Sequence, residues 1–435
     1  MAFNEKIFQS VLSEFEATPE MLREVATNFR KDLQMGLRNP DNSSLRMLKS
    51  YVGLPSGNEK GEFLALDFGG TNVRVSRIKL KGSGEFEIVR RVGEPLIVPG
   101  EYDYIGKDST AEQMFDFLAK LIDDAIEGDH DTKFYLGHTF SFPSTQDDLN
   151  NARLIIWTKE FATPGVEGEV VNDLLNAALK RRGINNVEPV AVINDTVAVL
   201  LSAAYKNAGI YIGSIYATGH NTCYLEPSVH DEKCFGQGGM ILNLESGGFM
   251  KLTPNRFDME FDRKSEKPGE QRLEKMASGR YMGELLGMAV AELTGENGKD
   301  YGFTSIDMSM MIFDETPNLE KASDIIAKKI GKQLELDDVK KIRELASAIV
   351  IRSARLVTCS FVGIIWQRAG EGEIEKQHIA IDGSVYEKMP LVKENIAKAL
   401  SELLGEDAAK VDTILDNGGS GLGAAIAAAM AVVDK

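Results

Sequence analysis

The sequence has few of the residues that build disulfides and metal sites. Its 435 residues include three cysteines, Cys223, Cys234 and Cys359, which are scattered and form no C-x-x-C pair. The five histidines have no metal-ligand spacing, and we expect each to be structural or on the surface. Reduced thiols in a cytoplasmic protein are the simplest interpretation of this cysteine usage.

The sequence also lacks long apolar runs and an excess of positive charge. No apolar run reaches membrane-spanning length, and the mixed, acidic stretch 1–29 has no signal-peptide core. Basic residues number 49 against 66 acidic ones, for a net charge of −17. We therefore expect neither nucleic acid nor an anionic membrane as the main partner. A small anionic substrate would need a locally positive site.

Several catalytic motifs are missing. The sequence contains no G-x-x-x-x-G-K-[ST], no G-x-S-x-G and no H-E-x-x-H, which excludes a P-loop and argues against the corresponding hydrolases. Gly419-x-Gly421-x-x-Ala424 fits the loosened dinucleotide fingerprint. Too few residues follow it to complete a βαβ unit, so we reject a Rossmann domain.

The most informative stretch that is present runs from Leu64 to Val75. An apolar strand ends at Asp67, turns through Gly69 and Gly70, and resumes as an alternating strand. A turn without side chains lets backbone N–H groups approach a phosphate closely. A carboxylate at the strand end can hold a metal ion or its waters near that phosphate. An ordinary glycine hairpin with an exposed acid is the alternative.

The chain length predicts two domains, or one fold with two lobes. Residues 210–217 and 222–225 predict a second glycine hairpin whose turn is 218–221, and residues 378–381 predict a further strand before Asp382. Two similar hairpins suggest two related lobes, with chance similarity as the competing interpretation. The glycine run 418–423 precedes an expected helix over 424–433, where it could contact an anion or nucleotide or serve as a flexible joint.

Short polar clusters follow several predicted strands. Amide, hydroxyl and carboxylate groups that converge from strand ends suit a polyhydroxylated ligand, because each sugar hydroxyl both donates and accepts hydrogen bonds. Taken singly, each such residue is more often a turn residue or a helix cap. The residues concerned are Ser141, Thr158, Lys159, Asn194, Asp195, Asn221, Glu245, Gln271 and Glu274.

Asp195 is the candidate general base. It follows a buried strand and precedes a helix, so its carboxylate is partly desolvated and can act on a hydroxyl. A plain N-cap for the helix that follows explains it locally as well. Lys159 and Arg74 are the basic residues nearest these turns in the sequence and are candidates for stabilising phosphoryl charge.

Taken together, these motifs resemble the hexokinase family of the eukaryotic type, over about Leu64 to Ala428. The first hairpin looks like the first phosphate motif, and Val192-Ile-Asn-Asp-Thr196 looks like the segment with the catalytic aspartate. The other matching segments are Leu136–Pro143, Trp157–Lys159, Ala217–Tyr224, Asn243–Phe249, Glu270–Gly279, Ile381–Ser384 and Gly419–Ala425.

The resemblance implies an α/β, two-lobed actin-like ATPase fold of the ribonuclease H-like type, with a mixed sheet flanked by helices in each lobe. The small lobe would be 59–194 plus 424–435, and the large lobe 1–58 and 195–423. It also implies a cleft between the lobes that closes over bound sugar.

The resemblance further implies transfer of the γ-phosphoryl group of ATP to the 6-hydroxyl of glucose and related hexoses, a glycolytic reaction, with Mg²⁺ bound to the nucleotide. Asp195 would be the base, with Lys159 and Arg74 assisting. Asp67 would be an outer-shell Mg²⁺ partner. The sugar would contact Ser141, Thr158, Lys159, Asn194, Asp195, Asn221, Glu245, Gln271 and Glu274. The nucleotide and its phosphates would contact Gly69, Gly70, Thr71, Asn72, Arg74, Thr218, Gly219, Asp382, Gly383, Ser384, Gly419, Ser420 and Gly421.

The sequence departs from the family pattern at three places. His220 stands in the second phosphate turn, where it would add bulk and a possible charge. Gly418 and Leu422 replace an acid and a lysine near the nucleotide motif, and His138 replaces an aromatic residue. An unusual phosphoryl donor, another hexose, or a non-catalytic sugar sensor on the same scaffold are the alternatives. We expect a monomer or a homodimer.

Overall fold

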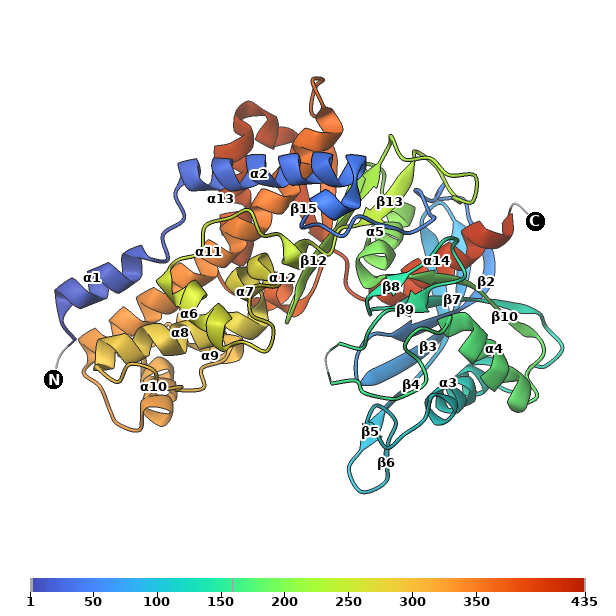
Figure 1. Cartoon of the computed structure of the whole chain (residues 1–435), viewed down its shortest axis with the longest axis horizontal. Helices are drawn as coiled ribbons and strands as arrows, with labels where there is room; N and C mark the ends of the chain where they lie inside the picture. The colour runs from blue at the N-terminus through green and yellow to red at the C-terminus, as the bar shows by residue number, and fades with distance from the viewer. Residues whose placement is uncertain (1–2, 159, 434–435) are drawn as a thin grey trace. The chain divides into compact units, whose positions relative to one another are not determined.

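The computed structural model describes residues 3–158 and 160–433 and forms two compact units. Unit 1 contains residues 1–47, 215–222 and 244–415, and unit 2 contains residues 48–214, 223–243 and 416–435. The lobe boundaries expected from the sequence divide the chain differently, and the assignment of lobes remains a prediction. Figure 1 shows the elements of each unit.

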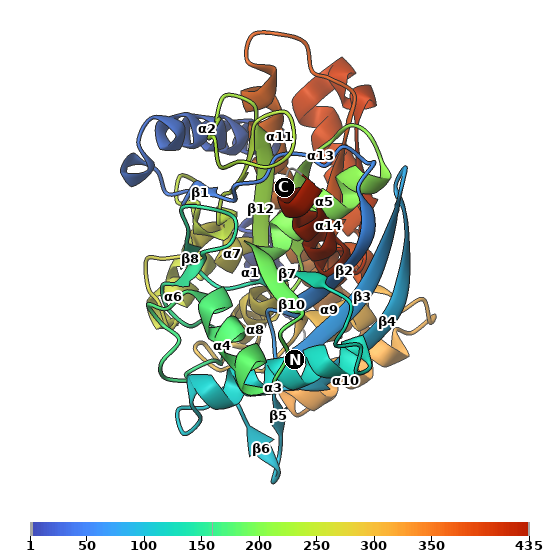
Figure 2. The same ribbon diagram turned by 90° about the vertical axis from the view of Figure 1, so that its right-hand side faces the viewer.

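Unit 2 is built on a five-stranded mixed sheet with the strand order β10–β7–β2–β3–β4. β10 and β2 run parallel to β7, whereas β3 is antiparallel to both β2 and β4. Figure 2 shows β2, β3 and β4 side by side in blue. The strands are β2 (Lys60–Phe68), β3 (Asn72–Gly82), β4 (Glu85–Pro95), β7 (Phe134–Phe140) and β10 (Val187–Ile193).

Helices cover this sheet and bury its apolar side chains. Helix α3 (Ala111–Ile126) packs against β3, β4 and α4 (Val171–Arg181). A capping box between Thr110 and Gln113 starts α3, because each side chain pairs with a backbone N–H that the first helical turn leaves unsatisfied. Apolar residues of α3, α4 and the strands form one buried core.

Helix α14 (Gly419–Val433) packs against β2, β7, β10 and α5 (Asp195–Lys206). The approach is so close that a Cβ atom on Gly137 of β7 would overlap the backbone of Ala424, 2.6 Å from its carbonyl carbon. A Cβ atom on Gly423 would lie 2.5 Å from Cα of Ala198. Glycine at these two positions therefore permits the close approach of α14 to β7 and to α5.

The shorter strands complete unit 2. β13 (Met240–Asn243) is antiparallel to β1 (Leu48–Lys49) and to residues 223–226 of β12 (His220–Glu226). Two small ribbons pair β5 (Ile97–Val98) with β6 (Tyr102–Asp103), and β8 (Ser144–Thr145) with β9 (Arg153–Leu154).

Unit 1 is mostly helical and is organised around α11 (Leu336–Ala369). α11 packs against α2 (Pro19–Arg38), α7 (Arg272–Ala277), α8 (Gly279–Thr294) and α13 (Val392–Leu404). The parallel strands β14 (Gln377–Asp382) and β15 (Val411–Leu415) also belong to it. The remaining helices are α1 (Glu5–Ser13), α6 (Arg256–Lys264), α9 (Ser305–Ile312), α10 (Glu320–Ile330) and α12 (Ser384–Lys388).

By length and composition, α11 could cross a membrane, but 89% of its most apolar window is buried inside the protein. Its Arg352 is buried and makes two hydrogen bonds of 2.8 Å to Asp258 of α6. A paired arginine inside a helical core is typical of a globular interior, because a lone buried charge would be costly. We therefore interpret α11 as the core helix of unit 1.

The predicted elements match the observed ones closely, with two shifts: β12 begins at His220, within the stretch 218–221 predicted as a turn, and the last helix begins early. The helix expected over 424–433 begins at Gly419, so Gly419, Ser420 and Gly421 lie in its first turn rather than in a loop before it. β11 (Ile210–Tyr216) and β12 form the predicted second hairpin, and residues of both strands are divided between the two units.

Candidate functional site

In unit 2, the turn of the first hairpin comprises Gly69, Gly70 and Thr71, between β2 and β3. A Cβ atom on Gly69 would lie 2.6 Å from Cβ of Ser141 and closer still to its hydroxyl. The Ser141 N–H donates to the carbonyl of Phe68 at 3.2 Å, and the Leu96 N–H donates to the carbonyl of Thr71 at 2.7 Å. The turn is thus anchored on both sides, whereas a Cβ on Gly70 would meet open space. Such an anchored turn can present its backbone N–H groups to a phosphate.

Asp67 and Arg74 are cross-strand partners at the base of this turn. They are paired in the β2–β3 register, and Nη1 of Arg74 lies 3.8 Å from Oδ2 of Asp67. Arg74 is exposed, and Asp67 is half-buried. A long, partly solvated pair of this kind contributes little to stability, so both groups can be used by a ligand.

The donor set around Asp67 fits Mg²⁺ only as part of a nucleotide complex. Within residues 3–158 and 160–433, no group of three or more His, Cys, Asp or Glu side chains could hold a metal ion by itself. Mg²⁺ in phosphate-transfer sites is commonly bound through one or two carboxylates, substrate phosphates and water. A single carboxylate beside a phosphate turn meets that requirement.

Asp195 is the first residue of α5, and only Asn194 separates it from the end of β10. The N-cap of this helix is Asn194, whose side chain accepts hydrogen bonds from the Thr196 N–H at 3.0 Å and the Thr196 hydroxyl at 2.8 Å. The interpretation of Asp195 as a plain N-cap is therefore wrong. Its Oδ1 accepts one hydrogen bond, from the Thr196 N–H at 2.8 Å, and its side chain stays half-exposed. A carboxylate held at a helix N-terminus with an accessible oxygen can accept a proton from a bound hydroxyl.

Ser141 and Thr158 flank an aromatic cluster in unit 2. Phe68, Phe142 and Trp157 pack with ring centroids 4.8–6.4 Å apart, and the indole N–H of Trp157 donates to the carbonyl of Thr163 at 2.8 Å. This packing fixes the segments that carry Ser141 and Thr158. Lys159, expected here as a catalytic and sugar-contact residue, lies outside the described residues.

His138 occupies the interior of the same cluster. Its ring stacks on Phe68 at 6.1 Å, and its Nδ1 lies 3.3 Å from Oδ1 of Asn172. Within the described part of the chain, its Nε2 has no hydrogen-bond partner. Burial lowers the pKa of His138 to about 4, so the ring is neutral at physiological pH. It therefore replaces an aromatic residue in packing without adding charge.

Gly419, Ser420 and Gly421 begin α14. The carbonyl of Ser420 accepts a hydrogen bond from the hydroxyl of Thr139 at 2.8 Å. A Cβ on Gly419 would lie 2.5 Å from Oδ2 of Asp416, a buried carboxylate that forms an ion pair with Lys206. Leu422 is buried. The first helical turn is thereby fixed against the sheet, with Ser420 and Gly421 half-exposed.

In unit 1, the turn of the second hairpin is Ala217, Thr218 and Gly219, and β12 begins at His220. The Ala217 N–H donates to the carbonyl of Gly219 at 2.9 Å. The carbonyls of Ala217 and Thr218 accept from the N–H groups of Gly279 and Arg280 at 2.9 and 3.0 Å. Helix α8 thus anchors the turn and leaves Thr218 exposed.

The expectation that His220 could bring a charge to the phosphates is wrong. His220 is buried, its Nδ1 lies 3.2 Å from the carbonyl of Ile215, and its Nε2 lies 3.4 Å from the hydroxyl of Ser246. Burial lowers its pKa to about 4. The imidazole is therefore a neutral packing group under the turn.

Four predicted sugar-contact residues converge beside this turn. The amide of Asn221 donates to Oε1 of Glu245 at 3.3 Å. A Cβ on Gly247 would lie 2.9 Å from Oε1 of Gln271 and from Cβ of Glu274. The structure thus assembles Asn221, Glu245, Gln271 and Glu274, which are half-buried, and we call them the amide–carboxylate cluster.

Two members of this cluster have unusual backbone conformations. Glu245 and Gln271 have φ values of 51° and 54°, a left-handed region that non-glycine residues seldom adopt. Such strain persists where surrounding structure imposes it and is frequent at binding sites. The positive φ sets the direction of the Glu245 side chain after β13 and of the Gln271 side chain directly before α7.

Ser246 also belongs to this site, although the sequence motifs do not single it out. This buried residue donates its N–H to Oδ1 of Asn221 at 3.1 Å and its hydroxyl to that of Thr222 at 3.1 Å. It orients the Asn221 amide so that the nitrogen faces Glu245. Its place directly after Glu245 in a Glu-Ser-Gly-Gly sequence was the available signal.

Asp382, Gly383 and Ser384 join β14 to α12. Gly383 has a φ of 130°, and a Cβ there would lie 2.6 Å from the carbonyl carbon of Tyr216 and 2.8 Å from Cβ of Ala217. The structure thus brings the third predicted strand-turn against the second hairpin within unit 1.

Comparisons with known proteins agree with this architecture. Two family models described as hexokinase match residues 7–205 and 211–430. Hexokinase-1 of Schizosaccharomyces pombe is 34% identical over 97% of this chain and 90% of that protein. A crystal structure of a hexokinase superposes with a TM-score of 0.87 at 34% identity, covering 98% of this chain and 99% of that one. A hexokinase from Schistosoma mansoni, solved with glucose, has a TM-score of 0.81 at 28% identity, covering 98% and 99%. The predicted fold class, with mixed sheets flanked by helices in two lobes, is confirmed.

Proposed function

The chain belongs to the hexokinase family and is a sugar phosphotransferase, and from that premise we propose that it transfers the γ-phosphoryl group of ATP to the 6-hydroxyl of glucose and related hexoses. The observation that carries this proposal is the amide–carboxylate cluster, in which two carboxylates and two amides converge beside a glycine turn. Carboxylates accept from sugar hydroxyls, and amides both donate and accept.

Asp195 is the proposed general base. Its carboxylate takes the proton of the 6-hydroxyl as that oxygen attacks the γ-phosphorus, and the bond to the β-phosphate oxygen breaks. Phosphoryl transfer depends on positioning of the reactants and stabilisation of charge more than on covalent catalysis by protein side chains. The Thr196 N–H, 2.8 Å from Oδ1 of Asp195, keeps this carboxylate oriented.

The proposed sugar ligands combine carboxylates, which accept hydrogen bonds, with amides, which both donate and accept them. The amide–carboxylate cluster would hold ring hydroxyls, and Ser141, Thr158, Lys159 and Asn194 would add further hydroxyl, ammonium and amide contacts. The Glu274 carboxylate also accepts the backbone N–H of His220 at 3.1 Å. That hydrogen bond limits the orientations available to the carboxylate before sugar binds.

The proposed phosphate contacts are the two hairpin turns. Gly69, Gly70, Thr71 and Asn72 would offer backbone N–H groups, and Arg74 would offer its guanidinium. Thr218 and Gly219 would contact the phosphates from the second turn. Asp382 to Ser384 and Gly419 to Gly421 would line the nucleotide. Mg²⁺, when bound with ATP, would neutralise phosphate charge, and Asp67 would hold its coordinated water.

We propose a cytoplasmic protein that acts as a monomer or homodimer without nucleic-acid or membrane partners. The other candidate functions are a sugar sensor without activity, a kinase for another hexose, and a kinase with a different phosphoryl donor. Asp195 and the amide–carboxylate cluster favour catalysis over sensing, because a sensor needs no base beside the acceptor hydroxyl.

A coupled assay across hexoses and phosphoryl donors tests the proposal. We expect turnover with ATP and glucose that requires added Mg²⁺. Turnover only with a different donor or a different hexose would show that the proposed substrates are wrong, while the assignment as a sugar kinase would stand. Glucose binding without turnover with any donor would favour the sensor.

A further inference from the structure

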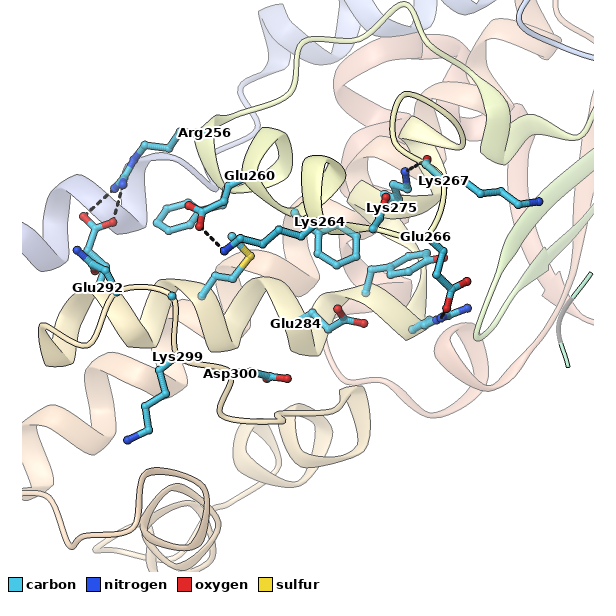
Figure 3. Close-up of a pocket in the computed structure, with 18 of the residues that line it drawn as sticks. Arg256, Glu260, Lys264, Glu266, Lys267, Lys275, Glu284, Glu292, Lys299 and Asp300 are labelled. Carbon is cyan, nitrogen blue, oxygen red and sulfur yellow. Dashed lines mark hydrogen bonds and ion pairs between the residues drawn. The ribbon is translucent and has the colours of Figure 1, made fainter.

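A pocket of about 540 Å³ lies within unit 1, among α6, the start of α7, α8 and residues 297–300. Its volume falls in the range of small-molecule sites. Figure 3 shows its lining side chains. Of the proposed sugar ligands, Gln271 also lines this pocket, whereas Asn221, Glu245 and Glu274 do not line it. The proposed hexokinase activity assigns it no role.

One wall of the pocket is apolar. The rings of Phe261 and Tyr281 pack at 5.3 Å between centroids, and Phe257 and Met288 extend this wall. Phe257 and Phe261 are buried, while Tyr281 and Met288 are half-buried. The wall can therefore contact the apolar body of a small ligand, and the Tyr281 ring already lies 5.3 Å from a guanidinium, that of Arg280.

Most basic side chains around the pocket are already neutralised by acids of the chain. Lys264 pairs with Glu260 at 2.6 Å, and Arg280 pairs with Glu266 at 3.3 Å. The other pairs are Arg256 with Glu292 and Glu14, Lys275 with Asp262, and Lys299 with Glu296. Lys267 and Lys299 point away from the pocket centre in Figure 3.

Two further acidic side chains line the pocket, Glu284 and Asp300. Within the described residues, Glu284 and Asp300 form no ion pair. Figure 3 shows Glu284 on α8 and Asp300 on the segment that follows this helix. Burial, together with the negative charges of Asp300 and Glu266, raises the pKa of Glu284, and Arg280 opposes this shift. Asp300 also accepts the Gly302 N–H at 2.8 Å. Both carboxylates are exposed, so the charge that they offer to a ligand is negative and partly solvated.

We propose that this pocket binds a small organic cation with an apolar body, an arylalkylamine in chemical class. Its ammonium group lies between the carboxylates of Glu284 and Asp300, and its ring packs on Phe261, Tyr281 and Met288. Attraction of a cation to carboxylates and to aromatic faces selects this class over neutral or anionic molecules of the same size.

Three probes with the same ring test the charge requirement. Phenethylamine, 2-phenylethanol and 3-phenylpropionate are titrated against the full chain by ligand-observed NMR. We expect the amine to bind about fivefold tighter than the alcohol, as for a partly solvated ion pair, and the carboxylate to bind weakest. Equal binding of amine and alcohol would overturn the proposal.

Substitutions then locate the site. Glu284→Gln should remove the advantage of the amine over the alcohol. Glu315→Gln, at an exposed glutamate outside the pocket, should leave it unchanged. Amine binding that survives in the Glu284→Gln, Asp300→Asn double variant would overturn the proposal. Displacement of the amine by glucose would do so too, because the amine would then occupy the sugar ligands. None of these measurements depends on catalysis, so their outcome is separate from that of the proposed function.

Discussion

The backbone N–H of His220 donates to Oε2 of Glu274 at 3.1 Å. Through this hydrogen bond, the Glu274 carboxylate of α7 connects the second glycine turn to the amide–carboxylate cluster. Glu274 also packs on Gly247, where an added Cβ atom would lie 2.9 Å from Cβ of Glu274. A single side chain thus links the second turn, proposed to contact phosphate, to the cluster that is proposed to bind the sugar.

Replacing Glu274 should therefore weaken hexose binding. Glu274→Gln keeps an acceptor for the His220 N–H but loses the charge that strengthens the hydrogen bond to sugar. We expect kcat/KM for glucose to fall about ten- to a hundredfold, as for loss of a charged hydrogen bond. Glu270→Gln, the same change at an exposed neighbour, is the matched control. Equal kcat/KM in both variants would remove Glu274 from the sugar site.

The two glycines of the first turn should respond differently to alanine. At Gly69, the new Cβ would lie 2.6 Å from Cβ of Ser141, so the backbone must move. At Gly70, it meets open space. We expect Gly69→Ala to cost about 1–3 kcal/mol of unfolding free energy and Gly70→Ala to cost little. Urea unfolding measures both, and equal losses would contradict the packing of Ser141 on the turn.

The contact between α14 and β7 gives a sharper stability test. In Gly137→Ala, the added methyl overlaps the backbone of Ala424, and neither backbone can rotate away. We expect a loss of about 3 kcal/mol or more. In Gly287→Ala, within α8, the nearest atom would be 3.9 Å away, and a gain of about 0.5–1 kcal/mol is expected from helix propensity. Thermal melts that rank the two variants in the opposite order would refute this packing.

Stability should fall as the pH drops from 7 to 5, because His138 and His220 are buried with a pKa of about 4 each. Between about pH 6.5 and 4, the unfolded chain binds protons that these folded histidines do not, so acid favours unfolding. Each histidine should account for about 2 kcal/mol of loss at pH 5.

His138→Phe should remove its share of this pH dependence while keeping a ring beside Phe68. His130→Asn, at an exposed histidine, should leave the pH dependence as it is in the unsubstituted chain. Denaturant unfolding at pH 7 and pH 5 measures all three proteins. An unchanged pH dependence in His138→Phe would show that this ring has the same pKa in the folded and unfolded chain, contrary to the lowered pKa of the buried ring.

The sequence was sufficient to predict much of the fold because the strands and helices have strong local signals. Continuous apolar runs such as 189–193, and glycine turns such as 69–70, are determined by the residues themselves. The residues proposed to contact the sugar were selected because each lies at the end of a predicted strand or near the start of a predicted helix. Asn221, Glu245, Gln271 and Glu274 are indeed brought together, although nothing local indicates that Glu245 and Gln271 adopt positive φ.

Other features depend on tertiary packing and could not be predicted. The burial that lowers the pKa of His220 depends on the packing around the turn, which its neighbours in the sequence do not indicate. The N-cap of α5 is Asn194 rather than Asp195, and two adjacent residues with similar capping ability cannot be separated by sequence alone. The early start of α14 accompanies the packing of its first turn against Thr139 and Val199, which the glycine run itself does not indicate.

The most direct test of the account is the activity of Asp195→Asn with ATP, Mg²⁺ and glucose. This substitution keeps the size and the acceptor for the Thr196 N–H and removes the base. We expect kcat to fall by a factor of about 10²–10⁴, as for loss of a general base, with glucose affinity retained in equilibrium titration. A variant with undiminished kcat would contradict the assignment of Asp195 as the base.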